Sequence, residues 1–375
     1  MNAVLLGYGT IGKGVEILCQ NIEEINLKQV FVRPSKVKKP YFDSDGIQMV
    51  SNPDVDIVFE CLNGIEPANA LITCALEHGK HVITSNKAVV SYNLERYIQL
   101  CKRYGGTIQI EACVAGGIPF LDAVLKLSQL EDLQGYEGIF NGTSNYILDQ
   151  MQKHNLDFSI ALKQAQELGY AEANPTNDIE GIDAFYKANI TNMLAYHTKN
   201  TTMHAPYGIS KISKCDIDFA KANQKVIRHL AISVQEGNTF STIIAPCFLD
   251  SHHYLANVPD NYNAQLIHAH SFGQLGYFGQ GAGQLATAQA MLANSIDTLQ
   301  NRERKIVLNH QKEWIPDLLK PDWILRSNIN LKEIFNVEPL KNHYYLVRNK
   351  SVAFIDQVLE ADPDAMVAIW RDTQC

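Results

Sequence analysis

Long apolar runs are absent from this sequence of 375 residues. A helix that crosses a membrane needs about 20 consecutive apolar residues, and no stretch comes close to that length, so we expect no membrane association. The segment A-V-L-L-G-Y-G, which begins at Ala3, breaks into glycines where a secretory signal would continue its apolar core. Together these features predict a cytoplasmic protein.

An excess of positive charge is also absent. Lys and Arg total 32 against 40 Asp and Glu, which gives a net charge of −8 at pH 7. Proteins that hold nucleic acid or anionic membranes by their overall charge are usually basic, so we expect neither as a partner. Hydrophobic residues make up 46% of the chain, enough for a sizeable core, and the length favours two or three domains.

Closely spaced cysteine pairs and histidine clusters are lacking. The eight cysteines are scattered without a C-x-x-C, which favours free thiols in a reducing compartment over a disulfide framework. His268 and His270 alternate along a predicted strand, a spacing that two metal ligands could use. No third ligand with suitable spacing follows, so we expect no zinc site.

The first 111 residues alternate between strand-like and helix-like segments. Pro67 stands in the first turn of one expected helix and Gly79 at its end, as helix boundaries favour. Such alternation predicts a parallel sheet covered on both faces, the α/β class. The expected strands are 4–6, 29–32, 55–60, 81–84 and 107–111, and the expected helices are 11–22, 67–78 and 94–104.

The pattern changes after Glu111, where longer helices mix with separated strands. We expect a second, α+β domain here, and a different character again in the last 70 residues, which hold all three tryptophans. The expected helices are 142–154, 158–168, 180–197, 221–234 and 284–300, and the expected strands are 133–140, 239–249 and 264–272.

The glycines of G-Y-G-T-I-G lie between the first strand and the first helix. Gly7 permits a tight turn, Gly9 lets the backbone approach a pyrophosphate, and Gly12 lets helix and strand pack closely. This setting predicts a dinucleotide-binding Rossmann domain rather than a plain glycine turn.

A basic segment stands where an NAD-specific enzyme usually has an acid. About 20 residues past the glycines an acidic side chain normally binds the ribose hydroxyls. Here Arg33 is followed by Lys36, Lys38 and Lys39, with no carboxylate before Asp43. A cationic cluster suits a 2′-phosphate, which favours NADP(H) over NAD(H); the alternative is a solvated basic loop.

Six further segments form the most specific pattern of the chain. They are I-V-F-E-C-L-N-G-I-E-P-A (57–68), G-K-H-V-I-T-S-N-K-A (79–88), E-A-C-V-A-G-G-I-P (111–119), G-I-F-N-G-T-S-N-Y-I-L (138–148), L-G-Y-A-E-A-N-P-T-N-D-I-E-G-I-D-A-F-Y-K (168–187) and G-Q-G-A-G-Q-L-A-T-A (279–288). In this order and spacing they resemble the homoserine dehydrogenase family over about residues 2–300.

The resemblance implies an oxidoreductase that interconverts L-homoserine and L-aspartate 4-semialdehyde with NAD(P), in threonine and methionine biosynthesis. It implies a homodimer or higher homo-oligomer with a small-molecule substrate. The implied domains are a Rossmann domain at 1–112 plus 284–304, a catalytic and dimerisation domain at 113–283, and a short tail at 305–375.

The resemblance also implies the roles of individual residues. Lys187 corresponds to the proton donor and Asp183 to its partner, Glu172 to the group that holds the substrate amine, and Lys87 to a lysine between cofactor and substrate. Further substrate-pocket positions are Gly142, Thr143, Tyr170 and Asp178. Cofactor positions are Gly7, Gly9, Thr10, Ile11, Gly12, Arg33, Thr84, Ser85, Lys87 and Gly283. A monovalent-cation site of backbone carbonyls is implied at Glu111, Val114, Gly116 and Ile118.

The residues of the fifth segment support this chemistry by themselves. Asp183 and Lys187 are spaced i, i+4 on a predicted helix and therefore share one face. A protonated lysine stabilises the charge that develops on an aldehyde oxygen and can donate a proton to it. The alternative is an ordinary ion pair on a helix surface, and for Lys87 a solvated lysine after a strand.

The loop at 111–119 has two compatible interpretations. Its glycines free the backbone to turn carbonyl oxygens inward, and oxygen ligands suit Na⁺ or K⁺ rather than a soft metal. The same glycines would also serve as a hinge between two domains.

Two other functions stay open. A non-catalytic NADP-binding sensor could keep the same fold, although it would not need Lys87, Glu172, Asp183 and Lys187. A related dehydrogenase could act on another amino acid. The tail is expected to fold as a truncated β–α–β remnant of a regulatory ACT domain, without a threonine site, from H-Y-Y-L-V (343–347) to M-V-A-I-W (366–370).

Overall fold

A computed structural model describes residues 1–341 and 343–372. The chain forms two compact units, which we describe separately. The first consists of Met1–Glu131, Asn189–Thr201 and Gln280–His310. The second consists of Asp132–Ala188, Thr202–Gly279 and the described residues from Gln311 onward. Among the described residues, no helix combines the length and the apolar character that crossing a bilayer requires.

The first unit is built on a six-stranded parallel sheet of order β3-β2-β1-β4-β5-β6. Its central strands β1 and β4 are short and, apart from Asn2, buried, because helices cover both faces. The order confirms the predicted Rossmann-type sheet. The strands are β1 (Asn2–Leu6), β2 (Asn26–Phe31), β3 (Phe42–Asp43), β4 (Ile57–Glu60), β5 (His81–Thr84) and β6 (Thr107–Gln109).

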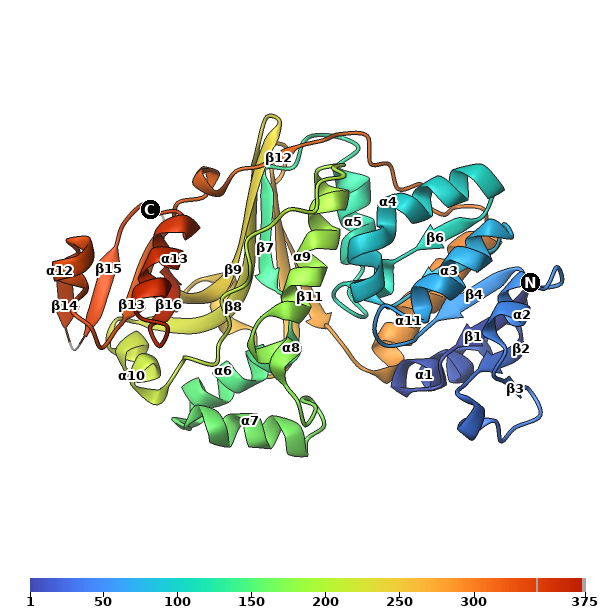
Figure 1. Cartoon of the computed structure of the whole chain (residues 1–375), viewed down its shortest axis with the longest axis horizontal. Coiled ribbons are helices and arrows are strands. Elements are labelled where there is room, and N and C mark those ends of the chain that lie inside the picture. The colour runs from blue at the N-terminus through green and yellow to red at the C-terminus, as the bar shows by residue number, and fades with distance from the viewer. Residues whose placement is uncertain (342, 373–375) are drawn as a thin grey trace. The chain divides into compact units, whose positions relative to one another are not determined.

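Helices α1 (Thr10–Cys19) and α11 (Gln284–Leu299) pack on one face of this sheet. Figure 1 shows α11, drawn in orange, beside the blue α1 although the two are far apart in sequence. Gly14 explains the close approach, since a Cβ there would lie 2.5 Å from the carbonyl oxygen of Gln284. The helix expected at 284–300 thus belongs to the first unit.

The remaining helices of the first unit follow the strands. Asn86 caps α4, accepting a hydrogen bond from the Val89 amide, and Gly105 ends it in the left-handed conformation. Helix α4 begins at Lys87, seven residues before the predicted start, so Lys87 lies in its first turn. The helices are α2 (Gly46–Ser51), α3 (Ala68–Glu77), α4 (Lys87–Tyr104) and α5 (Phe120–Leu127), with short 3₁₀ turns η1 (Pro34–Lys36) and η2 (Glu111–Cys113).

The second unit is built on a ten-stranded mixed sheet. Nine strands follow the order β11-β10-β7-β8-β9-β16-β13-β15-β14, and β12 pairs with β9. The strands are β7 (Gly135–Ile139), β8 (Lys225–Glu236), β9 (Thr239–Asp250), β10 (Tyr262–Ala269), β11 (Gly273–Gln280), β12 (Glu313–Trp314), β13 (Asp322–Arg326), β14 (Pro339–Lys341), β15 (Tyr344–Val347) and β16 (Met366–Trp370).

The helices of the second unit include those that carry the candidate site residues. They are α6 (Gly142–His154), α7 (Phe158–Glu167), α8 (Thr176–Ile179), α9 (Ile182–Ala195, which runs on into the first unit), α10 (Lys214–Ala222), α12 (Leu331–Phe335) and α13 (Val352–Ala361), with 3₁₀ turns η3 (Tyr254–Asn257) and η4 (Pro316–Leu318).

The helix predicted at 221–234 is wrong. Helix α10 ends at Ala222, and Lys225–Glu236 form β8, which pairs with β9 over twelve residues. The segment V-I-R-H-L-A-I-S-V contains β-branched residues whose spacing also fits a helix. This segment pairs with β9 across a turn at Gly237, whose φ is +54°, and the pairing stabilises the strand rather than a helix.

The described part of the tail from Gln311 onward belongs to the second unit, and its strands join the sheet of that unit. Strand β16 runs parallel to β9 and pairs with it, and Trp323 is buried in the common core. The predicted β–α–β is present as β15, α13 and β16, and β13, α12 and β14 precede it; Figure 1 shows these elements in orange-red and red. Its relation to a regulatory domain stays a prediction. The absence of a threonine site stays a prediction.

Candidate active site

A buried ion pair joins Asp183 and Lys187 on α9. The Lys187 Nζ lies 2.8 Å from Asp183 Oδ2, and each side chain is 8% exposed. The same ammonium group donates a hydrogen bond of 2.6 Å to the carbonyl oxygen of Phe140. The predicted i, i+4 pairing is therefore present, and its burial distinguishes it from a helix-surface ion pair. Lys163 and Glu167 on α7 form such a surface pair, with side chains 76% and 65% exposed.

Asn141 is a site residue that sequence reasoning missed. It caps α6, with its Oδ1 accepting from the Ser144 amide at 2.7 Å. Its Nδ2 donates to Asp178 Oδ1 at 2.7 Å and to Asp183 Oδ2 at 2.9 Å. One buried amide thus holds both carboxylates. The available signal was its place between a strand and a helix in G-I-F-N-G-T-S-N, a typical cap position.

The start of α6 lies against the segment that carries Tyr170. The Thr143 hydroxyl donates to the carbonyl oxygen of Tyr170 at 2.6 Å, and the rings of Tyr170 and Tyr146 meet edge to face at 5.1 Å. Gly142 has little room, since a Cβ there would come within 2.5 Å of the Asn261 carbonyl oxygen. The structure therefore brings Gly142, Thr143 and Tyr170 together.

Glu172 lies exposed in the turn after α7. Its backbone carbonyl accepts a hydrogen bond from Gln166 Nε2 at 3.1 Å, which fixes the turn. Its carboxylate does not share the burial of Asp183. Its assignment to the substrate amine stays a prediction.

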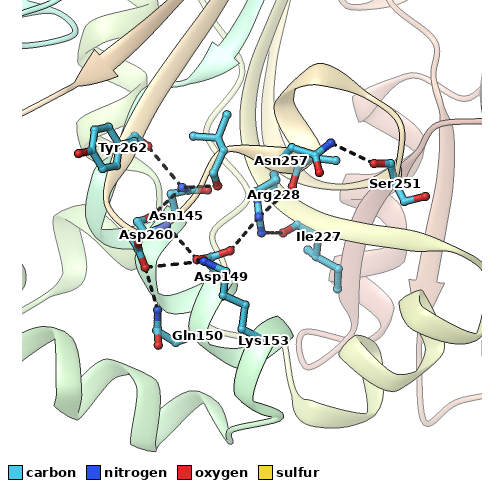
Figure 2. A network of polar contacts seen from close by, with 12 residues as sticks. Asn145, Asp149, Gln150, Lys153, Ile227, Arg228, Ser251, Asn257, Asp260 and Tyr262 are labelled. Carbon is cyan, nitrogen blue, oxygen red and sulfur yellow. Dashed lines mark hydrogen bonds and ion pairs between the residues drawn. The ribbon is translucent and has the colours of Figure 1, made fainter.

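A buried polar network fixes α6 to strand β8 and to the loop that contains Asp260 (Figure 2). Arg228 on β8 donates to Asp149 Oδ1 at 3.0 Å and to the Ala256 carbonyl at 2.9 Å. Asp149 Oδ2 accepts from the Asp260 amide at 2.9 Å, and the Asn145 Nδ2 donates to the Asp260 carbonyl at 2.9 Å. The loop next to Gly142 is thereby fixed to the same helix that carries Thr143.

The glycine-rich turn has the geometry that a dinucleotide requires. Gly7 has φ +97° and its amide donates to the Phe31 carbonyl, while a Cβ on Gly12 would come within 2.1 Å of the Gly7 carbonyl oxygen. Nothing lies within 4 Å of the Cβ position of Gly9, which is the N-cap of α1. The amides of Thr10, Ile11 and Gly12 stand in the first turn, where helices have no internal acceptors.

A buried carboxyl stands at the carboxyl ends of the neighbouring strands β4 and β5. Glu60 accepts a hydrogen bond of 2.5 Å from the Thr84 hydroxyl and one of 2.7 Å from the Leu62 amide. The Thr84 hydroxyl in turn accepts from the Asn86 amide at 2.9 Å. Glu60 therefore fixes the turn that holds Ser85 and leads to Lys87, at the sheet edge where open α/β folds bind ligands.

The titration of Glu60 leads to a testable dependence on pH. Burial raises the pKa of Glu60 to about 7 from 4.5, despite the hydrogen bonds from Thr84 and Leu62. Between these pH values the folded protein holds a proton that the unfolded chain releases. The stability that Glu60 contributes therefore falls as the pH rises through this window, by at most about 3 kcal/mol.

Glu60→Gln is accordingly expected to reduce the loss of unfolding free energy between pH 5 and pH 8 by up to about 3 kcal/mol relative to the wild type. Urea denaturation at both pH values measures this difference. The exposed Glu77, replaced by Gln, is the matched control and should follow the wild type. If the Glu60 variant also loses stability in parallel with the wild type, the carboxyl titrates normally.

The basic segment after β2 divides into two parts. Arg33, Lys36 and Lys38 are exposed. Lys39 instead lies 3.5 Å from the Glu16 carboxylate of α1. Lys39 is exposed as well and differs from the other three in this contact; the cationic cluster for a 2′-phosphate stays a prediction.

In the loop at 111–119, the Glu111 carboxylate caps helix α5. It accepts from the amides of Leu121 at 3.1 Å and Asp122 at 2.6 Å. Burial and the negative charge of Asp122 raise the pKa of Glu111 to about 8. Ala115 and Gly116 both have positive φ, at +60° and +56°, so the backbone turns sharply here.

Gly283, a predicted cofactor position, is the N-cap of α11 and has φ +129°.

His268 lies close to the Glu137 carboxylate, together with His253 and Arg371. Its Nε2 lies 3.8 Å from Glu137 Oε1, and His253 Nε2 lies 3.5 Å from the same oxygen. Arg371 of the tail pairs with the other oxygen. His253 and Arg371 lower the pKa of Glu137 to about 2 although burial opposes this. Within residues 1–341 and 343–372, no three His, Cys, Asp or Glu side chains are grouped to hold a metal.

Two family models match the chain: "Homoserine dehydrogenase, NAD binding domain" over residues 7–108 and "Homoserine dehydrogenase" over residues 119–296. The homoserine dehydrogenase of Neisseria gonorrhoeae is 35% identical over 318 residues, 79% of this chain and 72% of the relative. That of Pseudomonas aeruginosa is 31% identical over 357 residues, 91% of this chain and 80% of the relative.

Solved structures agree with these relatives. A homoserine dehydrogenase from Thiobacillus denitrificans matches with a TM-score of 0.87 at 26% identity and covers 99% of this chain and 98% of its own. One from S. aureus matches with a TM-score of 0.76 at 26% identity, covering 100% and 99%. By sequence and by structure, the chain belongs to the homoserine dehydrogenase family.

Proposed function

We propose that the protein interconverts L-aspartate 4-semialdehyde and L-homoserine with NAD(P)(H) as the redox partner. The observation that carries this proposal is the buried ammonium group of Lys187, held by Asp183 and the Phe140 carbonyl. A cation held in a water-poor site stabilises the negative charge that grows on an aldehyde oxygen during reduction.

In this mechanism Lys187 is the general acid of aldehyde reduction. Asp183 stabilises the protonated lysine at 2.8 Å, and Asn141 holds Asp183 in place at 2.9 Å. NAD(P)H, when bound, supplies the hydride that attacks the carbonyl carbon. Lys187 gives its proton to the resulting alkoxide, and in the oxidation of homoserine it accepts the proton from the alcohol.

Other side chains bind and orient the substrate in this proposal. Glu172 binds the substrate ammonium group, and Gly142, Thr143, Tyr170 and Asp178 line the pocket. Lys87 stands between cofactor and substrate. The Thr143–Tyr170 hydrogen bond and the Asn141–Asp178 hydrogen bond support a preformed pocket, because both fix these groups before substrate arrives.

The glycine-rich turn would hold the cofactor's pyrophosphate at the N-terminus of α1, and Thr84, Ser85 and Gly283 would line the site. Positive φ at Gly7 and the open Cβ position of Gly9 fit this role. NADP(H) is the preferred cofactor in this proposal because Arg33 stands where NAD enzymes place an acid.

A monovalent cation, Na⁺ or K⁺, is proposed at the backbone carbonyls of Glu111, Val114, Gly116 and Ile118. The sharp turn at Gly116, where φ is +56°, supports it.

The cellular setting is part of the proposal. We place the protein in the cytoplasm, in threonine and methionine biosynthesis, as a homodimer or higher homo-oligomer. We assign residues 1–112 plus 284–304 to the cofactor, 113–283 to catalysis and dimerisation, and 305–375 to a tail that carries no catalytic group.

Oxidation of NADPH in the presence of aspartate semialdehyde, followed at 340 nm, tests the proposal. Turnover with formation of homoserine supports it. Binding of NADPH without turnover would indicate the alternative, a non-catalytic sensor. Turnover only with other amino-acid aldehydes would indicate a related dehydrogenase.

The cofactor preference has its own test. Arg33→Ala is expected to raise KM for NADPH roughly 10-fold and to change that for NADH little, since a lost phosphate contact costs on the order of 1.4 kcal/mol. Initial rates with both cofactors measure this. Lys28→Ala, on the neighbouring strand β2, removes the same charge as a control. Equal KM values for both cofactors in the wild type would contradict the preference.

A further inference from the structure

Four polar side chains close a ring between helix α1 and the basic loop that follows β2. They are Tyr8, Glu16, Lys39 and Tyr41, and we call this set the loop lock. The Tyr41 hydroxyl donates to Glu16 Oε1 at 2.6 Å, and the Tyr8 hydroxyl donates to Glu16 Oε2. Lys39 Nζ donates to the hydroxyls of Tyr41 at 2.7 Å and Tyr8 at 3.0 Å.

Aromatic contacts support the loop lock. Phe42 meets Tyr8 edge to face at 4.8 Å and Tyr41 at 5.1 Å. The Lys39 ammonium lies 4.9 Å from the centre of the Tyr8 ring and 5.2 Å from those of Tyr41 and Phe42. A cation above aromatic rings gains further attraction, so Lys39 is held from several sides.

The negative charge of Glu16 and the positive charge of Lys39 are paired within the loop lock. Partial burial acts to raise the pKa of Glu16, but the hydrogen bonds from Tyr41 and Tyr8 and the charge of Lys39 together lower it. The hydrogen bonds that Lys39 donates to the hydroxyls of Tyr41 and Tyr8 raise the pKa of Lys39. Glu16 is therefore a carboxylate and Lys39 an ammonium, and each has partners within the loop lock.

The position of the lock gives it a consequence for the cofactor. Tyr8 lies between Gly7 and Gly9 in the glycine-rich turn, whereas Lys39 and Tyr41 end the loop that begins at Arg33. That loop contains one 3₁₀ turn, Pro34–Lys36, and exposed side chains from Arg33 to Lys39. Such a segment has few apolar contacts to hold it, so its conformation depends on how its end is fixed.

We propose that Glu16 and Tyr41 are positioning residues for the adenosine end of the cofactor: they fasten the basic loop to the glycine-rich turn, so that Arg33, Lys36 and Lys38 face the 2′-phosphate, while Lys39 serves the lock. This inference rests on the proposed NADP(H)-dependent function. It assigns Lys39 to the lock rather than to the phosphate.

The proposal predicts a change in NADPH binding that is opposite in sign to the change expected from charge alone. Removing the carboxylate of Glu16 makes this region more positive and releases Lys39, which by charge alone would tighten NADPH. In a lock, the same change loosens the loop and weakens NADPH. Tyr41→Phe breaks the ring without altering any charge, and it should act in the same direction.

Direct titration of NADPH fluorescence, together with initial rates, tests this. Glu16→Gln and Tyr41→Phe are each expected to raise the Kd and KM for NADPH roughly three- to tenfold with kcat unchanged, the usual worth of a lost hydrogen bond. The double variant should cost less than the product of the two, because both break one network. The effect on NADH should be smaller.

Matched controls separate the lock from general effects. Glu23→Gln, an exposed residue just beyond α1, removes the same charge, and Tyr104→Phe, at the end of α4, removes the same hydroxyl. Both should leave NADPH binding unchanged. Tighter NADPH binding in Glu16→Gln, or unchanged binding in Tyr41→Phe, would overturn the proposal.

The outcome also stays distinct from that of the proposed function. Kd for NADPH is measured without substrate, so the lock can be judged even if aspartate semialdehyde is not reduced. If the wild type binds NADPH and both variants bind it equally well, the lock fails while the proposed function stands.

Discussion

Lys187→Ala is expected to lower kcat for reduction of aspartate semialdehyde by roughly 10²–10⁴-fold, the usual contribution of a positioned general acid. The reason is geometric: the Lys187 side chain is 8% exposed, and its ammonium group lies 2.8 Å from Asp183 and donates a hydrogen bond to the Phe140 carbonyl, so no surface lysine can replace it. Steady-state rates at saturating NADPH measure the loss.

Two further variants make this result specific. Lys163→Ala removes a lysine from an exposed i, i+4 pair and should leave kcat unchanged. Asp183→Asn keeps the shape of the pair but removes the charge that holds the lysine, so it should lower kcat with folding intact. Near wild-type turnover in Lys187→Ala would show that another group delivers the proton.

Features that depend on local sequence patterns are predicted correctly. The parallel sheet and the glycine-rich turn follow from short segments whose residues act on their own backbone, such as Gly7 and Gly12. The Asp183–Lys187 pair likewise follows from spacing along one helix. The turn and the ion pair each depend on residues that are close together in the sequence, and the sheet follows from the alternation of strands and helices over the first 111 residues.

Features that depend on distant partners were missed. Lys39 is one of several lysines in a row, and only the fold brings it to Glu16 of the preceding helix. Asn141 holds Asp178 and Asp183, which follow about 40 residues later. The segment Lys225–Glu236 is a strand because a twelve-residue partner lies beside it. A single sequence does not state which distant segments meet.

The same limit applies to the tail. Tyr344, Arg326 and Asp216 form one buried cluster, with the Tyr344 hydroxyl 2.7 Å and the Arg326 Nε 2.8 Å from Asp216 Oδ1. The aromatic residues correctly indicated that the tail folds, since Tyr344 stacks on Phe219 at 3.9 Å. The number of its strands could not be read from them, because β13 and β14 are short and β14 is exposed.

Asp149→Ala is expected to lower the free energy of unfolding by about 3–5 kcal/mol, because it leaves the Arg228 charge buried without its partner. The side chains of Arg228 and Asp149 are 3% and 2% exposed, and their atoms lie 3.0 Å apart (Figure 2). Burial lowers the pKa of Arg228, and Asp149 offsets that effect. Urea denaturation followed by circular dichroism measures the loss.

Replacing both residues of this pair tests the cause. The double variant Asp149→Leu with Arg228→Met buries no charge and is expected to be more stable than Asp149→Ala alone. Asp364→Ala breaks an exposed pair with Lys211, in which Asp364 is 83% exposed, and should leave stability close to that of the wild type. Asp149 also accepts from the amide of Asp260, the residue before Asn261, whose carbonyl crowds Gly142. Activity in the double variant should therefore fall even where stability recovers, since the loop beside the substrate pocket loses its anchor; full activity would show that packing alone positions Gly142.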